Sequence, residues 1–260
     1  MRPRLLILGG TGEAADLARA VAAALPGLDA ITSLAGRTAA PPILPGQMRI
    51  GGFGGADGLL TFLRAEAIGL VADATHPFAA RISAHAAAAC AAAGLPRLVL
   101  RRPDWPRLPG DRWIEAADMA EAAARLPKLG RRAFLAVGRQ DLAAFAAVKD
   151  MDLVVRLLTA ESPPLPGCTV VTGRGPFRVE DETALLAAHR VEVVVSKAAG
   201  GEATYAKIAA ARRLGLPVLL IRRPPPPPGP TADDVPAAVA WIAATCAAGG
   251  CDPRRTAANR

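Results

Sequence analysis

Residues 6–13 read Leu-Ile-Leu-Gly-Gly-Thr-Gly-Glu, which predicts a buried strand, a glycine turn and the start of a helix. Glycines let the backbone approach a phosphate closely, and a helix N-terminus favours negative charge. Ala15 stands where the full Gly-x-Gly-x-x-Gly fingerprint has its third glycine, so a tight turn without a ligand is the alternative. The cofactor-binding candidates in this segment are Gly10, Thr11, Gly12 and Glu13.

Short apolar runs alternate with alanine-rich stretches of helical period along the rest of the chain. Most runs are apolar throughout, which is typical of parallel strands covered on both faces. Strands that alternate with helices predict a parallel α/β sheet with right-handed crossovers. The expected strands span residues 4–8, 29–33, 48–50, 70–74, 97–101, 132–137, 152–157, 169–172, 191–196 and 218–222.

A ten-residue segment occurs twice in the chain. Residues 94–103 (GLPRLVLRRP) match residues 215–224 (GLPVLLIRRP) at seven of ten positions, with an offset of 121 residues. Repeats of this length are as large as a domain, so the repeat predicts two similar Rossmann-like α/β domains and not a solenoid. We expect the active site in the cleft between the two domains.

Proline-rich segments give the expected domain boundaries. Three prolines and a glycine interrupt regular structure within residues 103–110, and residues 224–230 resemble a polyproline spacer. The expected parts are a cofactor domain at 1–103, a substrate domain at 104–230, a helix at 231–248 that packs back on the first domain with Thr231 or Asp233 as its N-cap, and a loose tail at 249–260.

The composition is that of an ordinary globular protein. The 260 residues are 52% apolar and 21% charged, which argues against disorder, collagen or a coiled coil. The net charge of +8 admits nucleic acid, membrane or an anionic small molecule as a partner. The uncharged stretches are too short and alanine-rich to span a bilayer. Four cysteines without metal-ligand spacing predict reduced thiols and no metal site, and we expect a cytoplasmic protein.

The end of the second expected strand bears on the choice of cofactor. An NAD site usually has an acidic residue there, which holds the ribose 2′-hydroxyl. Residues 31–37 read Ile-Thr-Ser-Leu-Ala-Gly-Arg and have no acid at that end. Ser33 and Arg37 suit a 2′-phosphate instead, so the sequence predicts NADP, with an ordinary surface arginine as the alternative. The loop Gly52-Phe53-Gly54 is a further candidate for cofactor contact, unless Phe53 belongs to the core.

The fourth expected strand ends in the sequence Asp-Ala-Thr-His-Pro-Phe, residues 73–78. Ligands of open α/β sheets bind beyond the carboxyl ends of the strands. Thr75 and His76 are therefore expected near the redox end of a dinucleotide, where His76 could donate a proton or a hydrogen bond. A structural histidine is the alternative.

The second half of the chain has cations where the first half has small residues. Its expected strand-end corners read Gly-Arg-Gln, Gly-Arg-Gly and Ser-Lys, and these corners predict a site for an anionic substrate, because guanidinium groups bind carboxylates in a bidentate manner. Solvated loop charges are the alternative. The candidate substrate-binding residues are Arg139, Arg174, Ser196, Lys197, Gly201 and Thr204.

Together these segments resemble the precorrin-6A reductase family of the corrin pathway to cobalamin. The matching segments are GGTGE at 9–13, TSLAGR at 32–37, GGFGG at 51–55, DATHPFA at 73–79, TGRGPF at 172–177, SKAAGG at 196–201 and TYAKIAAA at 204–211. They are spread over most of the chain. GGTGE alone is weak evidence, whereas DATHPFA followed by TGRGPF and SKAAGG is rather specific.

The resemblance implies an oxidoreductase that uses NADPH to reduce a ring double bond of precorrin-6A, giving dihydro-precorrin-6. The substrate would be an anionic tetrapyrrole rich in acetate and propionate groups, with a weak preference for the cobalt-free form, and the product could pass to the next enzyme of the pathway. Hydride transfer and protonation of the neighbouring carbon depend mainly on positioning. His76 and Lys197 are the catalytic candidates, and water is an alternative proton source.

Two other classes of protein remain as alternatives. An atypical short-chain dehydrogenase or epimerase also begins with Gly-Gly-Thr-Gly, but it would need a Tyr-x-x-x-Lys pair, and Tyr205 with Lys207 has the wrong spacing. A non-catalytic NADP-sensing or nucleic-acid-binding regulator would suit the positive charge. The sequence has neither a helix-turn-helix signal nor an aromatic stacking motif for that role.

Overall fold

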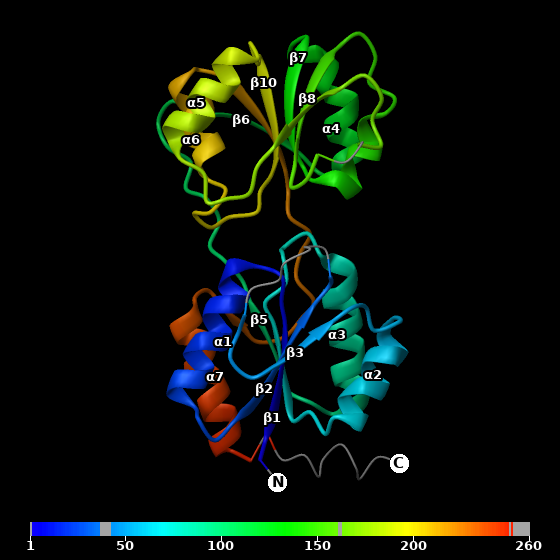
Figure 1. The fold of residues 1–260 in the computed structure, drawn as a ribbon, viewed down its shortest axis with the longest axis vertical. Coiled ribbons are helices and arrows are strands. Elements are labelled where there is room, and N and C mark those ends of the chain that lie inside the picture. Colours follow the sequence, from blue (N-terminus) through cyan, green and yellow to red (C-terminus); the bar gives the residue numbers. More distant parts are fainter. Residues whose placement is uncertain (1, 37–42, 161–162, 250, 252–260) are drawn as a thin grey trace. The chain divides into compact units, whose positions relative to one another are not determined.

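The computed structural model describes residues 2–36, 43–160, 163–249 and 251. The chain divides into two compact units, of which unit 1 contains residues 1–102 and 224–260 and unit 2 contains residues 103–223. Each unit has one six-stranded sheet, and every strand pair in both sheets is parallel. This architecture confirms the predicted α/β class with two parallel sheets (Figure 1).

Unit 1 has the strand order β12-β5-β4-β1-β2-β3. Helices α1 and α7 cover one face of this sheet, and α2 and α3 cover the other (Figure 1). The elements are β1 (Arg4–Leu8), α1 (Gly12–Ala24), β2 (Asp29–Leu34), β3 (Gln47–Ile50), α2 (Ala56–Ala65), β4 (Leu70–Asp73), α3 (Ala80–Ala93), β5 (Arg97–Leu100), β12 (Thr231–Ala232) and α7 (Val235–Ala247).

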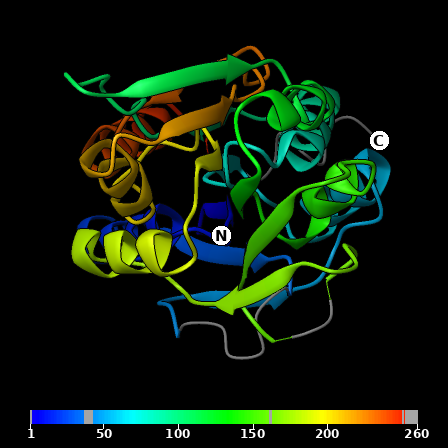
Figure 2. The same ribbon diagram turned by 90° about the horizontal axis from the view of Figure 1, so that it is seen from above.

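Unit 2 has the strand order β6-β11-β10-β7-β8-β9. Figure 2 shows its edge strand β6 lying beside β11. The elements are β6 (Arg112–Ala116), α4 (Met119–Arg125), the 3₁₀ helix η1 (Leu126–Lys128), β7 (Arg132–Ala136), the 3₁₀ helix η2 (Arg139–Phe145), β8 (Asp152–Leu157), β9 (Thr169–Thr172), α5 (Val179–Ala188), β10 (Val193–Lys197), α6 (Ala206–Arg213) and β11 (Pro217–Ile221).

The two sheets are topological equivalents with exchanged edge strands. The chain leaves unit 1 after β5 and adds β6 to unit 2, next to β11. After β11 it returns and adds β12 to unit 1, next to β5. Neither edge strand was predicted, because the region before β6 was interpreted as a boundary without regular structure. Thr231, a predicted N-cap, lies in β12, and α7 is capped by Asp234, whose Oδ1 accepts from the amide of Ala237 at 2.7 Å.

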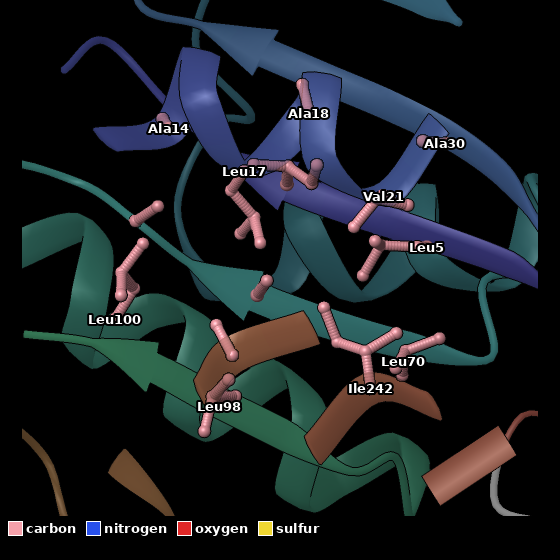
Figure 3. Packing of buried hydrophobic residues seen from close by; sticks show 14 of the residues in the cluster. Leu5, Ala14, Leu17, Ala18, Val21, Ala30, Leu70, Leu98, Leu100 and Ile242 are labelled. Carbon is pink, nitrogen blue, oxygen red and sulfur yellow. The ribbon is translucent and has the colours of Figure 1, made fainter. Parts of the chain in front are cut away.

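The core of unit 1 includes the helix that follows this exchange. Ile242 of α7 is fully buried among Leu70 and Leu98 of the sheet, and Leu17 of α1 belongs to the same cluster (Figure 3). A buried apolar side chain of this size contributes about 2–3 kcal/mol. The C-terminal helix is therefore an integral layer of unit 1.

The structure corrects the prediction that all four cysteines are reduced. Cys246 in the last turn of α7 is disulfide-bonded to Cys251, and the backbone between them turns at Gly249, which has a φ of +74°. Cys90 and Cys168 are free thiols, and burial raises the pKa of Cys90 to about 12. Apart from Gly249 and Cys251, the predicted tail at 249–260 lies outside the described residues.

Candidate functional site

The glycine corner after β1 is open and helix-capped. Gly10 has a φ of +109°, and a Cβ atom added at Gly10 or Gly12 would meet no atom within 4 Å. Thr11 is the N-cap of α1: its Oγ1 accepts from the amide of Ala14 at 3.1 Å and donates to the carbonyl of Ala74 at 2.8 Å. The corner therefore presents backbone N–H groups at a helix N-terminus beside the end of β4, which is the geometry that binds phosphate.

Glu13, a predicted cofactor-binding residue, forms an ion pair inside unit 1. Its carboxylate pairs with Arg102, which follows β5, at 2.9 Å. Burial lowers the pKa of Arg102, and the charge of Glu13 opposes that shift. Glu13 thus joins the first turn of α1 to the segment after β5, and the pair holds an arginine close to the glycine corner.

Ser33 lies opposite Arg49 in the register of β2 and β3. Ser33 is buried, and the Nη1 of Arg49 approaches its Oγ at 3.4 Å. Arg49 also lies over the ring of Phe53, with 3.9 Å between its Cζ and the ring centroid, and Phe53 packs at a steep angle against Phe62. Arg49 was not predicted from the sequence, because the cofactor candidates beside Ser33 were sought only in the loop after β2. Arg37, the arginine predicted instead, lies outside the described residues.

The segment after β4 is a hydrogen-bonded turn built on Asp73. The buried Oδ1 of Asp73 accepts from the amide of Thr75 at 3.2 Å and from its hydroxyl at 2.7 Å. The Nδ1 of His76 accepts from the amide of Phe78 at 3.2 Å. An imidazole that accepts at Nδ1 has its proton on Nε2 when it is neutral, so the turn fixes the donor end of His76.

The carboxyl edge of the unit 1 sheet brings most of the predicted cofactor residues together. Gly10, Thr11, Gly12 and Glu13 follow β1, Ser33 is in β2, Gly52, Phe53 and Gly54 follow β3, and Thr75 and His76 follow β4. The contact between Thr11 and Ala74 and the hydrogen bond from the amide of Gly51 to the carbonyl of Leu34 connect neighbouring corners. The edge can accept a long, anionic ligand along several consecutive strand ends.

The predicted cations of unit 2 also follow its strand ends, but Lys197 has an acidic neighbour. Lys197 ends β10 and forms an ion pair with Asp141 of η2. Arg139 is the first residue of η2, and Arg174 is exposed in the loop after β9. Ser196 is buried, and its Oγ donates to the carbonyl of Lys197 at 3.2 Å. Two arginines therefore follow β7 and β9, and an ion-paired lysine ends β10.

Two side chains that were not predicted from the sequence donate hydrogen bonds to the loop after β10. Trp105 donates from Nε1 to the carbonyl of Gly201 at 2.6 Å, and Lys207 donates from Nζ to the carbonyl of Thr204 at 2.6 Å. Burial lowers the pKa of Lys207 to about 7, which Glu182 opposes. The chain has only four lysines, and the place of Lys207 at the start of a helix was the signal available in the sequence.

A buried ion pair underlies the loop after β9. Arg156 of β8 makes two hydrogen bonds to Glu182 of α5, at 2.8 and 2.7 Å, and the two side chains are 10% and 2% exposed. The guanidinium of Arg156 also lies 4.2 Å from the ring centroid of Phe177, at the end of that loop. The pair fixes the base of the segment that presents Arg174.

Membrane-spanning helices and metal sites are both absent from the described part of the chain. No helix among those residues is long and apolar enough to cross a membrane. They also contain no cluster of three or more His, Cys, Asp or Glu side chains that could hold a metal ion.

Comparisons with known proteins agree on one family. The model of the family described as "Precorrin-6x reductase CbiJ/CobK" matches residues 4–243. The precorrin-6A reductase of Rhodococcus erythropolis is 52% identical over 92% of this chain and 97% of its own, and the cobalt-precorrin-6A reductase of Salmonella typhimurium is 28% identical over 84% and 86%. A solved structure described as "CobK precorrin-6A reductase" has a TM-score of 0.87 and 44% identity, covering 93% of this chain and 96% of that one. The chain therefore belongs to the precorrin-6x reductase CbiJ/CobK family.

Proposed function

We propose that this chain reduces a ring double bond of precorrin-6A with NADPH, giving dihydro-precorrin-6. The observation that carries the proposal is the open, capped glycine corner of unit 1 in a chain that is 52% identical to a precorrin-6A reductase. The cobalt-free substrate is favoured because the relative named for it is far more similar than the relative named for the cobalt form, at 52% against 28% identity.

The residues of unit 1 fit a dinucleotide. The space beside Gly10 and Gly12 admits a diphosphate, and the N-terminus of α1 stabilises its charge. Ser33 lies where the adenosine ribose is held in such sheets. Thr75 and His76 follow β4, next to β1 in the sheet, where the redox end of the cofactor would lie. When bound, NADPH supplies the hydride for the reduction.

The residues of unit 2 suit a substrate with many carboxylates. Arg139 and Arg174 would bind acetate or propionate groups, while Gly201 and Thr204 would contribute donors from an anchored loop. For protonation of the reduced ring, the protein would hold a proton on the Nε2 of His76 or on the Nζ of Lys197, with water as the other source. The main role of the protein would thus be to orient the ring for hydride transfer and to exclude unreactive orientations of the ring.

The proposal is tested by turnover with purified protein. We expect NADPH absorbance to fall when cobalt-free precorrin-6A is added. Oxidation of NADPH should be slower with the cobalt-loaded form, and oxidation of NADH should be slower than that of NADPH. No oxidation with either tetrapyrrole would refute the function, and faster oxidation with the cobalt form would refute the choice of substrate.

Single-turnover measurements separate the two catalytic candidates. His76→Ala and Lys197→Ala should each slow the reduction at saturating substrate if the replaced group protonates the ring. Asp141→Asn is the control for Lys197, because it breaks the same ion pair and keeps the ammonium group. If Asp141→Asn and Lys197→Ala have equal effects, Lys197 only positions η2. Unchanged rates for His76→Ala would exclude His76 as a proton donor.

A further inference from the structure

Arg49 is a cation with an unusual set of partners. It lies in β3, directly opposite Ser33 of β2. Its Nη1 donates to the carbonyl of Gly51 at 2.6 Å and its Nη2 to the carbonyl of Gly52 at 2.7 Å, while Nη1 approaches the Ser33 Oγ at 3.4 Å. The guanidinium plane is stabilised by the face of Phe53. The side chain is therefore held in one place at the carboxyl end of the second strand.

The charge of Arg49 is met by neutral groups alone within the described part of the chain. Its partners there are two carbonyls, a hydroxyl and aromatic rings. By contrast, Arg4 pairs with Glu66 at 2.7 Å, and Arg102 pairs with a carboxylate as well. Residues 37–42, which lie outside the described part of the chain, contain no acid in their sequence. A fixed, half-buried guanidinium without an anion favours an anionic ligand, and phosphate matches its geometry.

The position of this guanidinium identifies the phosphate. In doubly wound sheets the ribose hydroxyl of the adenosine lies at the carboxyl end of the second strand, where an acidic residue selects NAD. Here that end presents Ser33 with Arg49 beside it, and a phosphate esterified to the 2′-oxygen would reach both side chains. The glycine corner would hold the diphosphate on the adjacent strand, since β1 pairs with β2 in the sheet.

We propose that Arg49, together with Ser33, binds the 2′-phosphate of NADPH and determines the preference of the enzyme for NADPH over NADH. The inference rests on the proposed function, because it assumes that the dinucleotide binds at unit 1. It differs from the sequence-based prediction, which gave this role to Arg37. Arg49 has a second effect, since its hydrogen bonds to Gly51 and Gly52 shape the glycine-rich loop.

The test compares two probes that differ only in the 2′-phosphate, 2′,5′-ADP and 5′-AMP, by calorimetric titration of the 260-residue protein. Arg49→Met keeps the aliphatic stem over Phe53 and removes the charge. We expect it to weaken 2′,5′-ADP binding by about 10- to 100-fold, the range of hydrogen bonds to charged groups, and to leave 5′-AMP binding within about twofold. Arg49→Lys should have an intermediate effect, because it keeps the charge and loses the planar fork.

Two further variants make the result decisive. Arg37→Met tests the competing assignment and should leave the ratio of the two affinities nearly unchanged. Arg19→Met, on the exposed face of α1, controls for net charge. Equal losses of 2′,5′-ADP and 5′-AMP binding in Arg49→Met would overturn the proposal and reduce Arg49 to a loop-shaping residue. A large loss in Arg37→Met alone would return the role to Arg37.

Steady-state kinetics separate the failure of this inference from the failure of the proposed function. If wild type reduces precorrin-6A with NADPH but Arg49→Met keeps the same ratio of kcat/KM for NADPH and NADH, the function stands and the inference fails. If wild type binds neither 2′,5′-ADP nor NADPH, both are refuted. The expected result is a fall in that ratio that matches the loss in 2′,5′-ADP affinity.

Discussion

The corners after β1 and β7 occupy the same place in their sheets and are built differently. After β1 the chain enters α1, which has 13 residues and a side-chain cap from Thr11. After β7 it enters η2, a 3₁₀ helix of 7 residues that has no side-chain cap and begins with Arg139. The first corner can bind an anion with backbone groups and a helix dipole. The second corner lacks a regular helix start, so any anion there must be bound by side-chain cations.

The two units also differ in how they bury polar groups. Unit 2 encloses the pair of Arg156 and Glu182 with Lys207 nearby, whereas the buried Arg97 of unit 1 donates to the carbonyl of Pro228 at 2.8 Å. A buried ion pair is costly to break, because the remaining partner stays charged without compensation. Unit 2 therefore has the more deeply buried ion pair, and its stability depends more strongly on electrostatics.

The largest expected effect follows from breaking that pair. Glu182→Gln should lower the free energy of unfolding of unit 2 by about 3–5 kcal/mol, the cost of leaving a buried charge unpaired. The measurement is urea denaturation followed by tryptophan fluorescence in a Trp241→Phe background, because Trp105 and Trp113 both lie in unit 2. Asp16→Asn breaks an exposed pair in unit 1 and should cost less than about 1 kcal/mol when unfolding is followed by Trp241 in a background without Trp105 and Trp113. Equal effects would contradict the comparison.

The glycine corners can be compared with matched substitutions. Gly10 and Gly138 both have positive φ, +109° and +84°, and both have open space where a Cβ would lie. Either change to alanine should cost about 1–2 kcal/mol of stability. Only Gly10→Ala should weaken NADPH binding, by about tenfold or more, since its methyl group enters the phosphate site. Fluorescence titration with NADPH is the measurement, and a similar loss in Gly138→Ala would refute the assignment of the cofactor to unit 1.

The helix caps of the two units give a smaller effect. Thr11→Ala and Asp118→Ala each remove a side-chain N-cap, of α1 and α4, and each should cost about 1 kcal/mol in thermal unfolding. Thr11→Ala should also weaken NADPH binding, because Thr11 joins the glycine corner to the end of β4. If Asp118→Ala weakens NADPH binding as much as Thr11→Ala does, the cap of α1 has no specific role in cofactor binding.

A pH dependence within unit 2 offers a further comparison. Burial lowers the pKa of Lys207 to about 7 from its ordinary 10.5. Between these values the unfolded chain keeps a proton that the folded chain releases, so stability should rise with pH across this window. Lys207→Met removes the titration. The free energy of unfolding of wild type should therefore rise relative to that of the variant from pH 7 toward pH 10.5. Lys128→Met, at an exposed site, should show no such trend in denaturation curves measured along the same pH series.

The sequence predicts the central strands well because they are apolar along their whole length. Leu5 and Leu6, for example, belong to the clusters on opposite faces of the unit 1 sheet, and both are fully buried. The edge strands lack this signal: β12 has two residues, and β6 reads Arg-Trp-Ile-Glu-Ala with an exposed arginine and glutamate. Their exchange between sheets depends on long-range pairing, which no local pattern contains.

Residues of the candidate site could be predicted where they belong to a local sequence motif. The glycine corner and His76 come directly after apolar runs, so their place at the sheet edge follows from the strands. Arg49 does not, because it lies 16 residues after Ser33 and becomes its neighbour only through the register of β2 and β3. The disulfide of Cys246 was missed for a similar reason, since its partner returns through the turn at Gly249.

The exchange of edge strands sets an order of completion during synthesis. Unit 2 is a continuous segment, residues 103–223, and all of its strands have left the ribosome once β11 has emerged. Unit 1 begins first but lacks its edge strand and the α7 layer until residues 231–247 appear. The later half of the chain is thus the first that can finish folding, and the nascent N-terminal sheet has to wait with β5 as an uncovered edge.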